Sequence, residues 1–244
     1  MRTVIISDIH GNLAALELAL AEIGRLRPNA VVCLGDIAAA GPSPNGVIDR
    51  LATMPWTFIM GNTDEWLLKP ADEHPADEDA RRVEEIERWG AARLTPEFRA
   101  FLRTFLPTAI VETAPSSRML CYHGAPESTI TEIASTTSEE DLDRLLPRGF
   151  TLHAGGHTHI QMFRRHRESI VLNPGSLGLP MQTAADGAGR RPAWAEFATV
   201  DGDDEGAALR VELRRLPMPL ETVFAEARES GMPHAQWWMD AWAP

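Results

Sequence analysis

The sequence contains little cysteine and no long apolar segment. Its two cysteines, Cys33 and Cys121, both lie in apolar runs, so we expect buried reduced thiols rather than a disulfide or a zinc pair. No apolar run approaches the roughly 20 residues that a membrane-spanning helix needs. No signal peptide is visible before the first predicted strand. We therefore expect a cytoplasmic protein with no membrane partner.

Basic residues are also scarce. Lysine and arginine number 23 against 35 aspartates and glutamates, and the formal net charge at pH 7 is −12. Proteins that bind the nucleic-acid backbone are usually basic, so we expect no extended DNA or RNA binding. Bound divalent cations would offset part of the negative charge locally, which leaves a small phosphorylated substrate compatible with it. The hydrophobic fraction of 44% is typical of a globular protein with a substantial core.

The functional interpretation begins near the N-terminus. The β-branched run at residues 4–6 predicts a buried strand, and leucines at helical spacing predict a helix over about residues 12–26. Asp8 and His10 lie between the two. Residues two apart on an extended segment point to the same side, so these side chains can converge on one object. A carboxylate and an imidazole at the carboxyl end of a strand indicate a metal.

Further predicted strands also end in polar residues, most of them beside a glycine. The potential ligands that follow these strands are Asp36, Asn62, His123, His157 and His159. Imidazole, carboxylate and amide ligands together suit Mn, Fe, Zn, Co or Ni better than the all-oxygen sites of Mg or Ca. With Asp8 and His10, the set is too large for one tetrahedral ion. It fits two ions that share a carboxylate and leave positions open for water and substrate.

The remaining chain predicts mixed helix and strand within a single domain over residues 1–244. A helical excursion covers about residues 65–105. Strands are expected at 108–112, 118–122, 151–155, 194–200 and 207–216, with a hairpin formed by 160–165 and 169–172 and a helix at 220–228.

Four features of the sequence outside the predicted ligand set also allow structural predictions. His153 lies inside a predicted strand and is expected to be packed in the sheet, whereas His166 is expected at the surface. The aromatic tail around Trp238 is expected to dock on the core of its own chain, with a homodimer contact as the alternative. Residues 173–176, Asn-Pro-Gly-Ser, predict a turn that could lie near the metals.

The motifs resemble those of the calcineurin-like metallophosphoesterase family, in particular its small bacterial branch. The family signature is D-x-H, G-D, G-N-x-D/E, H and G-H-x-H, in that order. Here it reads Asp8-Ile9-His10, Gly35-Asp36, Gly61-Asn62-Thr63-Asp64, His123, and Gly156-His157-Thr158-His159. The resemblance implies an α/β fold: a four-layer αββα sandwich of two mixed β-sheets flanked by helices.

The resemblance also implies a ligand set for each of two divalent ions, with manganese favoured. The ligands expected at the first ion are Asp8, His10, Asp36 and His159. Those expected at the second are Asp36, Asn62, His123 and His157, so that Asp36 bridges. A hydroxide between the ions would attack phosphorus, and the residues expected to take part in catalysis are Asp36, Asn62, Asp64 and His123. Asn12 is expected to contact phosphate at the amino end of the first helix.

Thr63 departs from the pattern of the branches that carry a histidine there. That histidine is thought to protonate the leaving group, and threonine has no pKa in the useful range. We therefore expect a phosphoesterase acting on phosphodiester or phosphoanhydride bonds of small molecules such as nucleotides, with Thr63 near the substrate. The alternatives are a phosphomonoesterase, a diadenosine-tetraphosphate hydrolase and, more distantly, a non-catalytic scaffold subunit. His74 is either a substitute acid or an exposed surface histidine.

Overall fold

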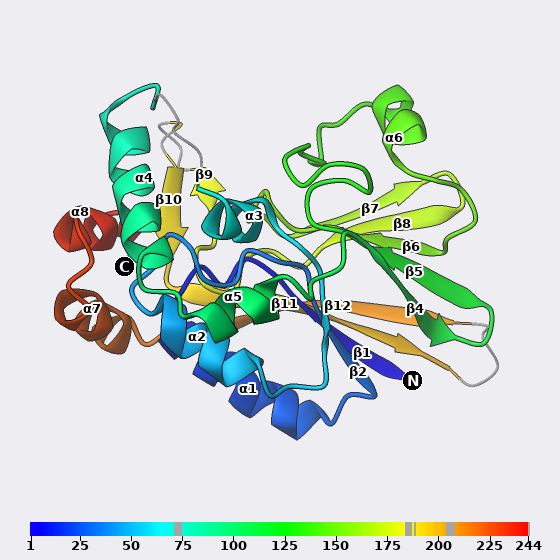
Figure 1. Ribbon diagram of the computed structural model, residues 1–244. Helices are drawn as coiled ribbons and strands as arrows, with labels where there is room; N and C mark the ends of the chain where they lie inside the picture. The colour runs from blue at the N-terminus through cyan, green and yellow to red at the C-terminus, as the bar shows by residue number, and fades with distance from the viewer. Residues whose placement is uncertain (71–74, 184–186, 188, 204–207, 244) are drawn as a thin grey trace.

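The computed structural model describes residues 1–70, 75–183, 187, 189–203 and 208–243. Within these residues the chain forms two five-stranded mixed sheets and one small three-stranded sheet. Helices flank the two large sheets, with α6 on the opposite side of the molecule from α1 and α2 (Figure 1). This arrangement confirms the predicted α/β sandwich of two mixed sheets.

The first sheet has the strand order β12-β11-β1-β2-β3. Its strands are β1 (Arg2–Ile6), β2 (Ala30–Cys33), β3 (Thr57–Phe58), β11 (Trp194–Gly202) and β12 (Leu209–Pro217). β1, β2 and β3 are parallel, while β11 and β12 are antiparallel to their neighbours. The carboxyl ends of the three parallel strands therefore meet at one edge, which is where Asp8, Asp36 and Asn62 follow them.

The second sheet is likewise a mixed five-stranded sheet, and its strand order is β4-β5-β6-β8-β7. Its strands are β4 (Ala109–Ala114), β5 (Ser117–Cys121), β6 (Leu152–Ala154), β7 (Met162–His166) and β8 (Ser169–Asn173). β5, β6 and β8 are parallel, and β4 and β7 close the edges in antiparallel fashion. His123 follows β5, and the segment with His157 and His159 follows β6.

Two apolar layers flank the first sheet and a third lies outside the second. Side chains such as Ile5 and Val32 from the first sheet pack against Met119 and Leu172 from the second in one buried cluster. The other face of the first sheet packs against α1 and α2, and the outer face of the second sheet packs against α6. Burial of apolar side chains in these layers is the main stabilising contribution.

The helices are α1 (Leu13–Leu26), α2 (Pro44–Leu51), α3 (Asn62–Leu68), α4 (Glu78–Ala91), α5 (Pro96–Leu102), α6 (Glu139–Leu145), α7 (Leu220–Glu229) and α8 (Ala235–Asp240). α3, α4 and α5 account for the predicted helical excursion. Asn12 forms the N-cap of α1, because its Oδ1 accepts a hydrogen bond from the N–H of Ala15 at 3.1 Å. None of the helices in the described residues is long and apolar enough to cross a membrane.

The aromatic tail docks on its own chain, as predicted. Trp238 is only 1% exposed, and its Nε1 donates to the carbonyl oxygen of Ala40 at 2.9 Å. The small third sheet, which the sequence did not indicate, joins β9 (Gln182–Thr183), β10 (Gly189–Pro192) and β13 (Trp242–Ala243). Both cysteines are free and buried, as expected.

Candidate metal centre

The predicted ligands lie in turns with an unusual backbone conformation. Residues in the left-handed region, with φ between 48° and 67°, include Asp8, His10, Asp36, His157 and His159. Residues other than glycine rarely adopt this conformation, and each instance costs on the order of 1 kcal/mol or more. Their concentration at one sheet edge indicates a site whose geometry is imposed by function.

Glycines allow the ligand turns to approach one another closely. A Cβ on Gly61 would lie 2.1 Å from Oδ1 of Asp36, and one on Gly156 would lie 2.1 Å from Oγ of Ser7. No side chain larger than a hydrogen atom fits at these two positions. The glycines of the G-N and G-H motifs are therefore required by the packing of the site.

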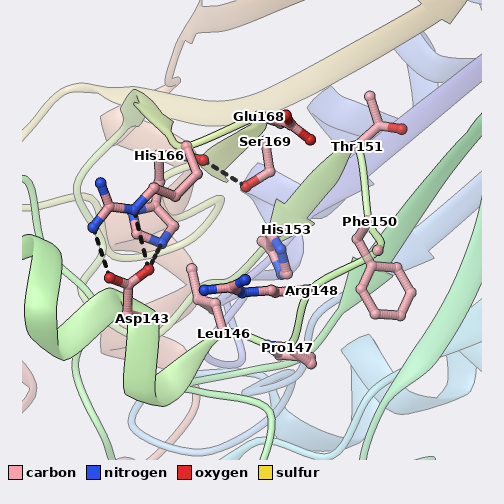
Figure 2. A pocket seen from close by; sticks show the side chains of 12 residues that line it. Asp143, Leu146, Pro147, Arg148, Phe150, Thr151, His153, His166, Glu168 and Ser169 are labelled. Atoms are coloured by element: carbon pink, nitrogen blue, oxygen red, sulfur yellow. Dashed lines mark hydrogen bonds and ion pairs between the residues drawn. The ribbon is translucent and has the colours of Figure 1, made fainter.

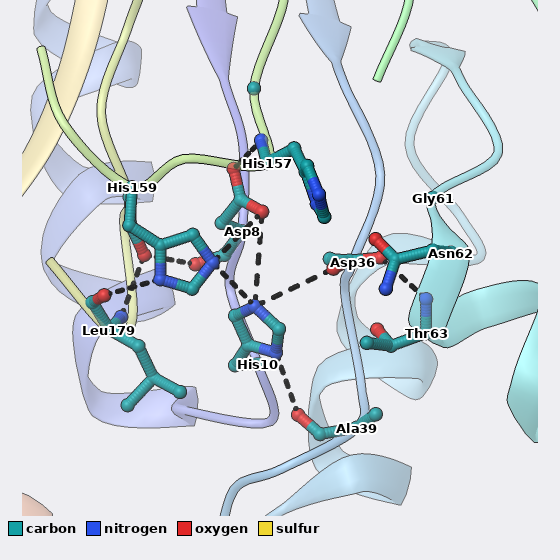
Figure 3. A network of polar contacts seen from close by, with 12 residues as sticks. Asp8, His10, Asp36, Ala39, Gly61, Asn62, Thr63, His157, His159 and Leu179 are labelled. Carbon is teal, nitrogen blue, oxygen red and sulfur yellow. Dashed lines mark hydrogen bonds and ion pairs between the residues drawn. The ribbon is translucent and has the colours of Figure 1, made fainter. Parts of the chain in front are cut away.

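The first group of ligand atoms comes from Asp8, His10 and His159 (Figure 3). The Nε2 atoms of the two histidines are 3.1 Å apart, and Oδ1 of Asp8 is 3.3 Å from Nε2 of His159. Nδ1 of His10 contacts the carbonyl oxygen of Ala39 at 3.1 Å, and Nδ1 of His159 contacts that of Leu179 at 2.7 Å. A carbonyl only accepts, so each Nδ1 carries the proton and each Nε2 is available to bind a cation.

The second group consists of Asp36, His123 and His157. Nε2 of His123 lies 3.4 Å from Oδ2 of Asp36 and 3.0 Å from Oδ1 of Asn62. Nδ1 of His123 contacts the carbonyl oxygen of Leu34 at 2.7 Å, which fixes the same tautomer as in the first group. The carboxylate, imidazole and amide atoms of this group therefore also face one point.

Asp36 connects the two groups. Its Oδ2 lies 3.7 Å from Nε2 of His10 in the first group and 3.4 Å from Nε2 of His123 in the second. Its Oδ1 accepts a hydrogen bond from the N–H of Thr63 at 2.9 Å, which fixes the rotation of the carboxylate. One oxygen atom thus faces both groups, as a carboxylate shared by two ions would.

The donor set fits divalent metal ions. Asp8 is fully buried, and its Oδ1 has no hydrogen-bond partner among the described residues. A buried carboxylate oxygen without a partner is strongly unfavourable unless a cation lies beside it. Burial and the neighbouring His159 lower the pKa of His10 to about 4, so its imidazole is neutral, the form that coordinates a metal. Two ions would neutralise both carboxylates.

Asp64 is buried beside this centre and is engaged by the backbone. Its Oδ2 accepts from the N–H groups of Asp36 at 2.7 Å and Gly61 at 3.2 Å, and its Oδ1 accepts from Ile37 at 3.0 Å. Burial and the neighbouring Asp36 raise its pKa to about 7. These hydrogen bonds tie the turn of the G-D motif to the start of α3, which positions Asp36 opposite Asn62.

Three predicted substrate or acid residues have different outcomes. The structure does not support a phosphate contact by Asn12: the side chain is fully buried, and its Nδ2 donates to the carbonyl oxygen of Gly178 at 3.0 Å. The Asn12 side chain instead caps α1 through Oδ1 and binds the loop containing Gly178 through Nδ2. Thr63 lies in the first turn of α3, and its buried Oγ1 has no hydrogen-bond partner in the part of the chain that the structure describes. His74 lies outside the described residues.

The Asn-Pro-Gly-Ser turn positions two ligand segments, a role that the sequence only hinted at. Oγ of Ser176 donates to the carbonyl oxygen of Asp8 at 2.6 Å. Nδ2 of Asn173 donates to the carbonyl oxygen of Gly156 at 2.7 Å and lies 3.1 Å from Oγ1 of Thr158. The turn therefore connects the D-x-H segment to the G-H-x-H segment.

Of the two histidines outside the ligand set, one was predicted wrongly. His166 is only 5% exposed, because α6 lies over it and its Nδ1 contacts Oε2 of Glu139 at 2.7 Å. The prediction of a surface residue is therefore wrong. His153 lies on β6 and is 2% exposed, in agreement with its expected packing in the sheet.

Comparison with known proteins identifies the class to which this fold and site belong. Residues 1–191 match the calcineurin-like phosphoesterase superfamily domain. The match covers more than half of the chain, so the protein belongs to this family, as the motifs predicted. The family and the fold are those of phosphoesterase hydrolases that use divalent metals.

Individual relatives support the same fold. The chain is 25% identical over 182 residues to the uncharacterized protein MJ0912 of Methanocaldococcus jannaschii, covering 72% of this chain and 69% of that protein. A metallophosphoesterase from Sphaerobacter thermophilus superposes with a TM-score of 0.74 at 23% identity, over 99% of this chain and 98% of the other. The protein PH1004 of Pyrococcus horikoshii gives 0.77 at 19%, over 98% and 96%.

Proposed function

We propose that this protein is a dinuclear metal-dependent phosphoesterase. Its expected substrates are phosphodiester or phosphoanhydride bonds of small phosphorylated molecules, nucleotides among them. The observation that supports this most is the position of Asp36, whose Oδ2 faces the imidazoles of both ligand groups. Manganese is our favoured metal by resemblance to the family, and the mixed imidazole and carboxylate donors are compatible with it as with Fe, Zn, Co or Ni.

The protein residues would bind the ions and keep them close together. When bound, two divalent ions would supply an activated water and neutralise negative charge on the phosphoryl oxygens. Asp36 would be shared, while the backbone carbonyls behind His10, His123 and His159 keep Nε2 directed at the centre. Such fixed orientation reduces the reorganisation needed during the reaction.

The environment of Thr63 favours substrates with a good leaving group. Its hydroxyl is buried with no hydrogen-bond partner among the described residues and has no pKa that would allow it to donate a proton at neutral pH. The nearby Asp64 carboxyl is occupied by three backbone N–H groups. Neither residue is therefore placed to protonate a strongly basic leaving group, which would disfavour unactivated monoesters.

Hydrolysis of a substrate panel by the manganese-reconstituted protein tests the proposal. The panel contains bis(p-nitrophenyl) phosphate, p-nitrophenyl phosphate, cyclic nucleotides and diadenosine tetraphosphate, with bound metal measured by elemental analysis. We expect diester or anhydride turnover that exceeds monoester turnover and is lost in Asp36→Asn. Absence of turnover on every substrate by protein carrying two ions per chain would refute the enzyme assignment and favour a scaffold. Turnover of the monoester p-nitrophenyl phosphate that exceeds turnover of every diester and anhydride would refute the substrate assignment.

A further inference from the structure

A cleft of about 600 Å³ lies on the outer face of the second sheet (Figure 2). It is bounded by the segment after α6, by Thr151 before β6 and by Ser169 at the start of β8. The cleft therefore opens at the amino ends of these parallel strands, whereas the metal centre lies at the carboxyl ends. None of its lining residues belongs to the predicted ligand set.

His153 contributes a buried polar group to this cleft. The side chain is 2% exposed, and its buried Nδ1 has no hydrogen-bond partner among the described residues. Burial and the neighbouring His166 lower its pKa to about 4, so the ring is neutral at pH 7 and offers one N–H and one lone pair. Buried polar groups are nearly always hydrogen-bonded, so the unpaired ring indicates a missing partner.

Arg148 supplies an exposed positive charge beside His153, in the same cleft as the Asp143 carboxylate (Figure 2). It is exposed, and no hydrogen bond or ion pair joins it to another described residue. Arg167, on the same cleft, differs, because it forms two hydrogen bonds with the carboxylate of Asp143 at 3.2 and 2.7 Å. Glu168 lies at the exposed rim, where its charge disfavours highly charged anions.

An apolar wall completes the cleft. Leu146 and Pro147 line it together with Phe150. The ring of Phe150 lies edge-on to that of His153, with the centroids 5.7 Å apart and an interplanar angle of 69°. A partly buried aromatic ring next to unpaired polar groups is typical of small-molecule sites.

We propose that this cleft is a second ligand site, which binds a small organic anion carrying a planar ring. The carboxylate or phosphate oxygens of the ligand pair with the guanidinium of Arg148. The N–H of His153 donates to the same ligand, and the ligand ring packs against Phe150, Leu146 and Pro147. The site is independent of the metal centre and of the reaction proposed for it.

Calorimetric titration of the full-length, metal-loaded protein tests this site. The probes are benzoate for the carboxylate source, AMP for the phosphate source, and inorganic phosphate as an anion without a ring. We expect benzoate or AMP to bind at least about tenfold more tightly than phosphate. Arg148→Gln should weaken that binding about tenfold, as expected for one lost charged hydrogen bond. The ring nitrogens of His153 should also shift in nitrogen NMR spectra when the ligand binds.

Matched variants separate this site from the metal centre and from general charge effects. Arg103→Gln removes an exposed arginine outside the cleft and should leave the affinity unchanged. Asp36→Asn should lose hydrolysis and keep benzoate or AMP binding, so the two proposals can fail separately. The proposal is overturned if neither ring-bearing anion binds, if phosphate binds equally well, or if Arg148→Gln has no effect. Binding that disappears in Asp36→Asn would place the ligand at the metals and would also overturn it.

Discussion

The buried histidines at the carboxyl ends of the parallel strands and the buried His153 on β6 differ in how they are held. At the carboxyl ends, His10, His123 and His159 each have Nδ1 fixed by a backbone carbonyl. On the outer face, His153 is equally buried but has no such contact. The three rings held in this way are pre-organised to bind a cation through Nε2. Nδ1 of His153, in contrast, has no hydrogen-bond partner among the described residues. Burial alone therefore does not distinguish a metal ligand, but the contact behind the ring does.

The largest expected effect is that of removing the shared carboxylate. Asp36→Asn replaces a charged oxygen that faces both ligand groups with a neutral amide, so we expect turnover to fall by roughly 10²–10³-fold or more. Steady-state kinetics and elemental analysis would measure this loss and the accompanying loss of metal. Asp49→Asn removes an exposed carboxylate on α2 and is the matched control. Equal turnover in both variants would contradict the role of Asp36.

A smaller effect is expected from Ser176, which contacts the backbone of the candidate ligand Asp8 and is not itself a candidate ligand. Ser176→Ala removes the hydrogen bond to the carbonyl oxygen of Asp8, and such outer contacts change metal affinity by about 10–100-fold. Competition with a fluorescent chelator measures the change. Ser135→Ala, which alters an exposed serine, should leave the affinity as it is. An unaltered affinity in Ser176→Ala would show that the turn does not position Asp8.

Close packing at the metal edge should also appear in stability. Gly61→Ala places a Cβ 2.1 Å from the Asp36 carboxylate, and we expect it to lower the free energy of unfolding by about 1–3 kcal/mol. Gly24→Ala is the control, because a Cβ at this position of α1 meets nothing within 4 Å. Since alanine is the better helix former, the control should be stabilised by up to about 1 kcal/mol. Urea denaturation of both variants measures the difference.

The smallest effect concerns the unfixed histidine and its dependence on pH. The folded pKa of His153 is about 4 against 6.5 for an ordinary histidine, so below pH 6.5 the unfolded state binds more protons. His153 therefore destabilises the fold progressively as the pH falls from 6.5 towards 4. His153→Phe should remove this contribution, with little change above pH 7. Identical pH profiles of the two unfolding free energies would contradict the prediction.

The convergence of the candidate ligands could be predicted from sequence because its determinants are local. Asp8 and His10 follow a β-branched run, and Asp36 follows another, so strand direction alone brings them to one edge. The αββα arrangement of the whole chain was inferred from resemblance, since periodicity does not show how two sheets pack.

Other features depend on contacts between distant residues. The hydrogen bond from Ser176 to Asp8 spans 168 residues, and the burial of His166 follows from its contact with Glu139 on α6. Asn12 was assigned to phosphate because a helix start suits anions. The loop containing Gly178 takes up its amide instead. Such pairings are set by tertiary packing, which local patterns do not encode.

The contact between Trp238 and Ala40 has a consequence for the order in which the chain is synthesised. The carbonyl oxygen of the preceding residue, Ala39, contacts Nδ1 of His10. Trp238 follows Ala40 by 198 residues in the chain. At about 5–20 residues per second, the ribosome needs roughly 10–40 s to add that length. Throughout this interval Asp8, His10 and Asp36 are already synthesised. Trp238 is not yet present to contact Ala40 in the loop behind His10. The packing behind His10 is thus completed only late in translation, although His10 itself lies near the start of the chain.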